Sequence, residues 1–273
     1  MSEQTRRRLM EQVRTPGPDL AELALLVCAE LEPELDVSTE LLRLDAFADQ
    51  LRTQGVTRRD PPLDVAGAMS AHLGHRLGFH GDTDDYHDPA NALLTRVLDR
   101  RRGLPITLSI LWIGVAQRLG VPAFGIGLPG HFVTGIGPPD QAVVVDPFAR
   151  GTLLDRDDLD DLVQHVTAGQ AHFHPAMIRP SPAPAVVRRL LDNLTRDFLA
   201  GGDVEDALWT IELKQILPRA SPDDDRTRGD LLLRLGRYLD AARAFEDYVA
   251  RAQGAGDRDE VATMARRARA KLN

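Results

Sequence analysis

The segment Gly103–Leu119, which reads GLPITLSILWIGVAQRL, constrains the fold most strongly because it is apolar on nearly every side. A helix without a polar face is normally buried, with other elements packed around it. Pro105 suits the first position of such a helix, where its missing N–H removes no hydrogen bond. A Gly-Val-Pro turn at residues 120–122 then ends it. The sequence therefore predicts one central buried helix.

Short β-like runs follow this helix, at residues 123–128, 131–136 and 142–145. The tetrapeptide Gly-Pro-Pro-Asp at 137–140 separates the last two runs and predicts an antiparallel hairpin. A central helix packed against a small antiparallel sheet is an α+β arrangement. We therefore expect an α+β core, which we place at residues 61–180.

Helices are expected on both sides of this core. Apolar residues recur at helical spacing within residues 1–60, which we predict to be an N-terminal helical segment, and a further helix is expected over residues 63–77. A length of 273 residues favours at least two domains. Four prolines between residues 175 and 184 mark the expected boundary with a third segment, residues 185–273.

This last segment repeats itself with a period of 34 residues: Gly202, Ala207 and Ile211 recur as Gly236, Ala241 and Phe245. Small residues allow two antiparallel helices to approach closely, and the bulky residue one turn later fills the remaining space. The period and residue types match the tetratricopeptide pattern. We predict a pair of helical hairpins that offers a surface for a protein or peptide partner.

Composition excludes several functions. A net charge of −8 argues against general affinity for nucleic acid, which requires a basic face. Cys28 is the only cysteine, so neither an internal disulfide nor a multi-cysteine metal site can form. No segment has the roughly 18 apolar residues that span a bilayer. We expect a cytoplasmic protein without membrane contact, metal or cofactor; its oligomeric state stays open.

Two residues of the predicted hairpin are candidates for chemistry. His131 opens one expected strand after Leu128-Pro129-Gly130, and Asp146 ends the next one before Pro147. On antiparallel neighbours these side chains would lie close together, and the carboxylate could then hold the imidazole in one tautomer. Each residue could also stand there for local structural reasons.

Four motifs in the same region resemble the SirB1 family, which belongs to the transglutaminase-like, papain-related superfamily and carries tetratricopeptide repeats after its core. They are RRGLPITL at 101–108, GVP at 120–122, PGHF at 129–132 and DPF at 146–148. In active enzymes of this superfamily a cysteine starts the central helix, and a histidine and an aspartate lie on adjacent strands. The resemblance implies that His131 and Asp146 occupy these two positions.

The resemblance also implies that the nucleophile is absent, because Pro105 stands at the position of the cysteine, 17 residues before Pro122. Thr107 and Ser109 are possible atypical nucleophiles. However, a helix turns about 100° per residue, so Thr107 points away from the face of position 105, and Ser109 lies about 6 Å further along the axis. Cys28 falls on the apolar side of an N-terminal helix, which favours a buried, inert thiol.

The other polar clusters have ordinary explanations. Residues 81–90 form an acidic loop whose spacing fits a calcium site poorly and is typical of a solvated loop. His72 with His75, and His172 with His174, lack the third ligand that zinc requires. Arg101 and Arg102 either face an anion at the start of the central helix or are solvated.

Two hypotheses result. The first is a transglutaminase-like protein without catalytic cysteine that binds or scaffolds proteins. The second is a hydrolase or an amide- or acyl-transfer enzyme that uses His131 and Asp146 with an atypical nucleophile or an activated water. The identity of substrate or partner is not encoded in any recognisable motif.

Overall fold

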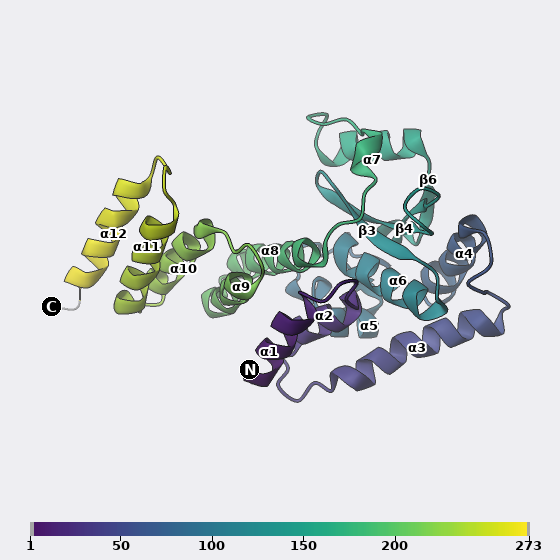
Figure 1. The fold of residues 1–273 in the computed structure, drawn as a ribbon, viewed down its shortest axis with the longest axis horizontal. Coiled ribbons are helices and arrows are strands. Elements are labelled where there is room, and N and C mark those ends of the chain that lie inside the picture. Colours follow the sequence, from purple (N-terminus) through teal and green to yellow (C-terminus); the bar gives the residue numbers. More distant parts are fainter. Residues whose placement is uncertain (1–2, 272–273) are drawn as a thin grey trace. The chain divides into compact units, whose positions relative to one another are not determined.

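The computed structural model describes residues 3–271. The chain divides into two compact units, Met1–Leu190, called unit 1, and Leu191–Asn273, called unit 2 (Figure 1). The division into three segments at 1–60, 61–180 and 185–273 stays a prediction.

The expected central helix is α6, Pro105–Leu119, and its first twelve residues are all buried. Leu104 precedes it without a side-chain cap, and Gly120 ends it in the left-handed conformation at φ 79°. Helices α2 (Leu20–Cys28) and α3 (Val37–Thr53) pack on α6 from one side, and the sheet packs on it from the other (Figure 1). The first twelve residues of α6 carry no charged side chain because every side of them is buried in the protein.

The sheet has four antiparallel strands in the order β3-β4-β5-β6. They span Ala123–Leu128, His131–Ile136, Val143–Asp146 and Thr152–Leu154. On the face toward α6, the ring of Phe132 lies over Gly125. A Cβ atom at residue 125 would come within 2.4 Å of this ring, so the glycine leaves room for it. On the other face Ile126, Val133 and Val144 pack with α7 (Arg156–Val166). The expected helical fold with a small antiparallel sheet is confirmed, and β6 is an addition to it.

The elements before α6 complete unit 1. They are α1 (Glu3–Gln12), α4 (Pro62–Met69), the π-helix η1 (Ser70–Arg76), the strand β1 (His80–Gly81), the turn η2 (Pro89–Asn91), α5 (Leu94–Arg100) and β2 (Arg102–Gly103). Strands β1 and β2 form a short parallel pair that the sequence pattern did not predict.

The helix expected over residues 63–77 is instead α4 followed by the π-helix η1. A Cβ atom on Gly74 would lie 1.9 Å from the carbonyl oxygen of Arg150, so only glycine permits this contact. The Ser70 hydroxyl donates to the same carbonyl at 3.1 Å, and Arg150 Nη1 donates to the Gly74 carbonyl at 3.2 Å. The wider turn of a π-helix brings Ser70 and Gly74 against the segment that follows Asp146.

Unit 2 is helical. The helices are α8 (Ala183–Gly201, which begins in unit 1), α9 (Val204–Ile216), α10 (Pro222–Arg234), α11 (Tyr238–Arg251) and α12 (Arg258–Ala270). Helix α11 packs against both α10 and α12. Ala207 and Ala241 are fully buried, and Phe245 fills the space beside Gly229, where a Cβ atom would come within 2.4 Å of its ring. Within residues 3–271, no helix combines the length and the apolar character needed to cross a membrane.

Candidate functional site

His131 and Asp146 form a hydrogen-bonded pair in unit 1. His131 is the first residue of β4 and Asp146 is the last residue of β5, and 3.1 Å separate His131 Nε2 from Asp146 Oδ2. The register Thr134↔Val145 makes the two residues diagonal neighbours on one face of the sheet, which brings their side chains within reach. The structure therefore brings together the two residues that the sequence pattern singled out; their chemical role stays a prediction.

The hydrogen-bond pattern defines the tautomer of the imidazole. A carboxylate can only accept, so Nε2 of His131 donates this bond; in the neutral ring, Nδ1 is then the nitrogen with the lone pair. The second oxygen of Asp146, Oδ1, accepts from the Phe148 backbone N–H at 2.9 Å, which fixes the carboxylate at the start of the turn η3 (Pro147–Ala149). This is the arrangement that prepares a histidine to act as a base.

The pair is shielded from solvent, with His131 only 6% and Asp146 only 4% exposed. Phe148 meets the imidazole edge to face at a centroid distance of 5.9 Å, and Tyr86 packs on Phe148 at 6.0 Å. Phe148 can lie there because residue 81 is glycine, whose added Cβ atom would come within 2.3 Å of the ring. Phe148 thus lies against the imidazole, Tyr86 supports Phe148, and little of the histidine is open to solvent.

Arg189 forms hydrogen bonds with the backbone beside His131. Arg189 Nη2 donates to the carbonyl oxygens of His131 at 2.7 Å and Leu128 at 3.2 Å. It holds the turn between β3 and β4, from which His131 projects. The pattern of the sequence offered no signal for Arg189 or Tyr86, whereas Phe148 lies within the Asp-Pro-Phe motif.

The position expected for a nucleophile is the start of α6. Pro105 is the first residue of that helix and is buried. Helix α6 packs on β4, which carries His131, and on η3, which follows Asp146 directly. The pyrrolidine ring of Pro105 contains neither sulfur nor oxygen. The residue at this position therefore supplies no attacking atom.

Thr107 and Ser109 are both completely buried within α6. The Ser109 hydroxyl donates to the Phe132 carbonyl at 3.4 Å, and the Thr107 hydroxyl has no hydrogen-bond partner among the described residues. Within residues 3–271, neither hydroxyl is hydrogen-bonded to His131, whose side-chain bond goes to Asp146. The structure therefore does not bring either residue into a nucleophile–base contact.

Cys28, the third alternative, lies in α2 and is 1% exposed. Burial raises the pKa of its thiol from the ordinary 9.0 to about 11, although hydrogen bonds with Thr95 lower it. A thiol reacts as the thiolate, so burial suppresses its reactivity through both access and charge.

We expect Cys28 to resist alkylation by iodoacetamide at pH 8 in the folded protein and to react at the rate of a free cysteine in denaturant. Mass spectrometry of timed samples measures both rates. Labelling of the folded protein within the time of the denatured control would show that α2 opens readily and would contradict the buried thiol.

No metal site is present among residues 3–271, where no three His, Cys, Asp or Glu side chains converge. In the acidic loop, Asp82 is 2% exposed and accepts from the backbone of Asp84 and Asp85 and from Arg100. Its carboxylate is thus used within the protein. His172 lies 3.5 Å from Asp160, and His174 caps the turn η4 (Pro175–Met177), so both have local roles.

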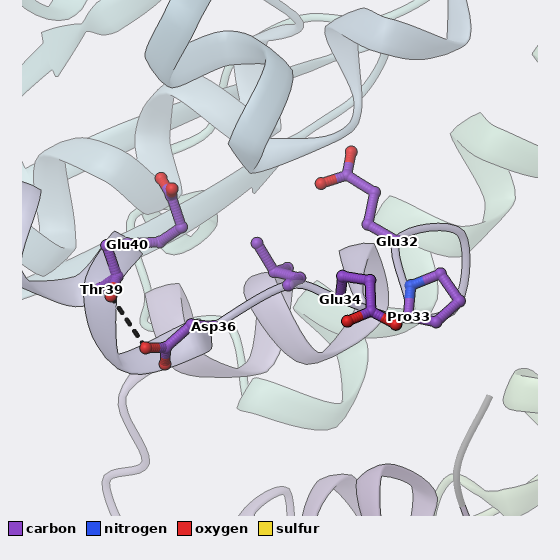
Figure 2. Close-up of a pocket in the computed structure, with 7 residues that line it drawn as sticks. Glu32, Pro33, Glu34, Asp36, Thr39 and Glu40 are labelled. Carbon is purple, nitrogen blue, oxygen red and sulfur yellow. Dashed lines mark hydrogen bonds between the residues drawn. The ribbon is translucent and has the colours of Figure 1, made fainter.

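Neither His131 nor Asp146 lines any of four hollows on the surface of the described residues. The largest of these four, about 510 Å³, lies where the loop after α2 enters α3 and carries the acidic side chains drawn in Figure 2. Three of the four carboxylates there have partners: Asp36 accepts from Thr39 at 2.8 Å, Glu32 pairs with Arg96 and Glu40 pairs with Arg43. The hollow is therefore separate from the histidine pair. The carboxylates of Glu32, Asp36 and Glu40 are already bound to other residues of the protein.

Comparison with known proteins places this geometry in a family context. The family described as Transglutaminase-like superfamily matches residues 39–192, which include Pro105, His131 and Asp146. A UPF0162 protein of Xylella fastidiosa (strain Temecula1) is 32% identical over 235 residues, which cover 84% of this chain and 83% of the relative. A UPF0162 protein of Pseudomonas aeruginosa is 28% identical over 231 residues, which cover 83% of this chain and 81% of the relative. Human F-box only protein 21 is 33% identical over 139 residues, covering 48% of this chain and 21% of that protein.

Proposed function

This chain belongs to the Transglutaminase-like superfamily, and from that premise we propose that it is a non-catalytic member of the SirB1 type that binds or scaffolds proteins. In this proposal unit 1 keeps the fold of an acyl-transfer enzyme without its nucleophile. Unit 2 is a tetratricopeptide-like hairpin array that supplies the surface for a protein or peptide partner. We place the protein in the cytoplasm.

The observation that carries the proposal is Pro105 at the first position of α6. In active members of the superfamily this position holds the cysteine whose sulfur attacks the substrate carbonyl. Proline is well suited to begin a helix but cannot form an acyl intermediate. The fold therefore gains a stable helix start at the point where an enzyme requires a thiol.

Three features of the surrounding residues support the loss of catalysis. Thr107 and Ser109 are buried, and within the described chain neither is bonded to His131. The Cys28 thiol is buried in α2 with its pKa raised to about 11. His131 is only 6% exposed and meets the Phe148 ring edge to face, so a general base that needs approach within about 3 Å of a substrate proton has little open surface here.

The features of unit 2 that support a binding role are its repeated pattern and its packing. Gly202 and Gly236 both adopt positive φ angles, 86° and 72°, after α8 and α10. The small residues Ala207 and Ala241, 34 residues apart, are both buried where successive helices pack. Repeats of this kind commonly present extended surfaces to other proteins.

The competing function is a hydrolase in which His131, held by Asp146, activates water. The orientation of the imidazole favours it, because Nε2 is bound to Asp146 and Nδ1 is left outside that bond. This function requires solvent to reach a side chain that is 6% exposed.

An affinity capture from cell lysate separates the two functions. The bait is the full chain in four forms: wild type, His131→Ala, Leu239→Asp and Leu42→Asp. Leu239 is an exposed apolar side chain of unit 2, and Leu42 is its counterpart on unit 1, with exposures of 38% and 64%. We expect one partner to be retained by wild type, His131→Ala and Leu42→Asp and lost from Leu239→Asp.

The catalytic arm uses the same proteins in assays of amide hydrolysis and of amine incorporation into a glutamine-containing peptide. The proposal expects no turnover above buffer with any form. Turnover by wild type that disappears in a folded His131→Ala protein would overturn the proposal and establish the hydrolase.

A further inference from the structure

A small apolar hollow of about 220 Å³ lies on unit 1, between α3, the segment after η1 and the end of α5. Phe79 and Leu98 are almost fully buried beneath it, and the rings of Phe47 and Phe79 meet edge to face at a centroid distance of 5.7 Å. The complete lining is Arg43, Ala46, Phe47, Leu77, Phe79, Leu98 and Arg101. The lining thus combines two aromatic rings with two guanidinium groups.

The first of these guanidinium groups is already occupied. Arg43 Nη1 donates to Glu40 Oε2 at 2.9 Å and to Asp99 Oδ1 at 2.7 Å, and its Nη2 donates to the Leu98 carbonyl at 2.9 Å. These bonds fix Arg43 as part of the wall. They also pair the carboxylates of Glu40 and Asp99 with a positive charge, which weakens the repulsion of an anion by these two groups.

The second guanidinium is free. The side chain of Arg101 is exposed and forms no hydrogen bond or ion pair with any residue in the range 3–271, whereas Arg100 pairs with Asp82 and Arg102 pairs with Asp84. The backbone of Arg101 is held firmly: its N–H donates to Val97 at 2.8 Å and its carbonyl accepts from His80 at 3.0 Å. A free guanidinium is therefore presented at the rim from a fixed position.

We propose that this hollow binds the C-terminal residue of a partner polypeptide, with the apolar side chain over Phe47 and Phe79 and the terminal carboxylate on Arg101. The charge of Arg101 is complementary to a carboxylate, which the planar guanidinium can grip with two parallel hydrogen bonds. Capture of a terminal carboxylate is an established mode of peptide recognition. The site is independent of the histidine pair and of unit 2.

The size of the hollow favours one side chain of a polypeptide over a whole small molecule as its occupant. Sites for whole small molecules occupy about 300–1,000 Å³ and enclose most of the ligand. A hollow of about 220 Å³ takes one large side chain and leaves the rest of the ligand outside. The remaining chain of a polypeptide would continue over the surface.

The test uses the full chain and two fluorescein-labelled hexapeptides, Gly-Ser-Gly-Ser-Gly-Phe with a free carboxylate and the same peptide with a C-terminal amide. Fluorescence polarisation is expected to give a Kd for the free acid that is at least about tenfold lower than for the amide, because a charge-assisted hydrogen bond is lost with the amide. Arg101→Gly is expected to abolish this difference. Glycine is chosen because residue 101 has a φ of 60°, which glycine adopts without strain.

Two further variants control the result. Arg102→Ala removes the neighbouring arginine, which pairs with Asp84, and is expected to leave the Kd within about twofold. Ala46→Phe, at an exposed position of α3, fills the hollow while Arg101 remains, and is expected to abolish binding of both peptides. Thermal unfolding of each variant reports whether the fold is intact.

Equal affinity for the free-acid and amide peptides would overturn the proposal. So would an equal loss of affinity for the free-acid peptide in Arg102→Ala and Arg101→Gly. Binding of N-acetylphenylalanine as tight as that of the hexapeptide would also overturn it, because the hollow would then be a site for a small carboxylate. Retained binding in a folded Ala46→Phe protein would place the peptide elsewhere.

Discussion

Replacement of Pro105 by cysteine is expected to create a thiol that reacts with iodoacetamide at pH 6 at least about tenfold faster when His131 is present than when it is replaced by alanine. The new thiol would stand at the N-terminus of α6, and α6 packs on β4, which begins with His131, and on η3, which follows Asp146. Helix N-termini and neighbouring histidines lower thiol pKa values from about 8.5 to about 3.5–7.5, which raises the thiolate fraction at acidic pH. Rates at several pH values, measured by mass spectrometry of the peptide that contains residue 105, give the pKa of the thiol.

Pro105→Ala is the structural control, because it makes the same change at the helix start without the sulfur. Cys28 in the same molecule is an internal reference that is expected to stay unlabelled. If the thiol introduced at position 105 titrates near the ordinary value of about 8.5 and reacts equally fast with and without His131, the assignment of this position to the nucleophile is contradicted. The proposal of a non-catalytic protein depends on that assignment.

Gly151→Ala is expected to lower the free energy of unfolding by roughly 2–5 kcal/mol. A Cβ atom at residue 151 would lie 2.1 Å from the ring of Trp112, which is fully buried in α6, so the core must shift. Overpacking of this kind costs about 1–3 kcal/mol. Residue 151 also has a φ of 80°, which costs an L-residue about 1–2 kcal/mol more.

Gly78→Ala is the matched control because Gly78 has nearly the same φ, 81°, and no atom within 4 Å of the added Cβ. It should show only the backbone penalty of about 1–2 kcal/mol. Urea denaturation of both variants gives the two free energies, and their difference isolates the contact with Trp112. Equal losses would mean that Trp112 adjusts freely, which would contradict a tightly packed connection between α6 and the turn that carries Asp146.

The sequence predicted the elements whose pattern is local. The apolar run that forms α6 predicts a buried helix, because a helix that is apolar on all sides must be covered by other elements. The strands 123–128 and 131–136 were found because Gly, Pro and Asp mark the turns beside them. The helix over 63–77 was only partly right, since the π-helix depends on Gly74 meeting Arg150, which is 76 residues away in the chain. Short strands such as β1 and β2 have too few residues to form a pattern.

The same distinction holds for the site. Pro105, His131 and Asp146 could be named from motifs because each lies at the end of a predictable helix or strand. Tyr86, Phe148 and Arg189 around His131 could not be assigned roles from the sequence, because their roles arise from packing between segments that lie far apart in the chain.

By itself, the amino-acid sequence determined that a buried helix begins with proline, that a histidine begins one strand and that an aspartate ends the next strand. Only the tertiary structure decided that these two side chains share a hydrogen bond of 3.1 Å and that the Phe148 ring lies against the imidazole. It also decided that Arg101, which has no side-chain partner within residues 3–271, lines an apolar hollow. The physical reason is range: helix and strand signals act over a few residues, whereas burial and charge pairing depend on contacts that exist only after the chain has folded.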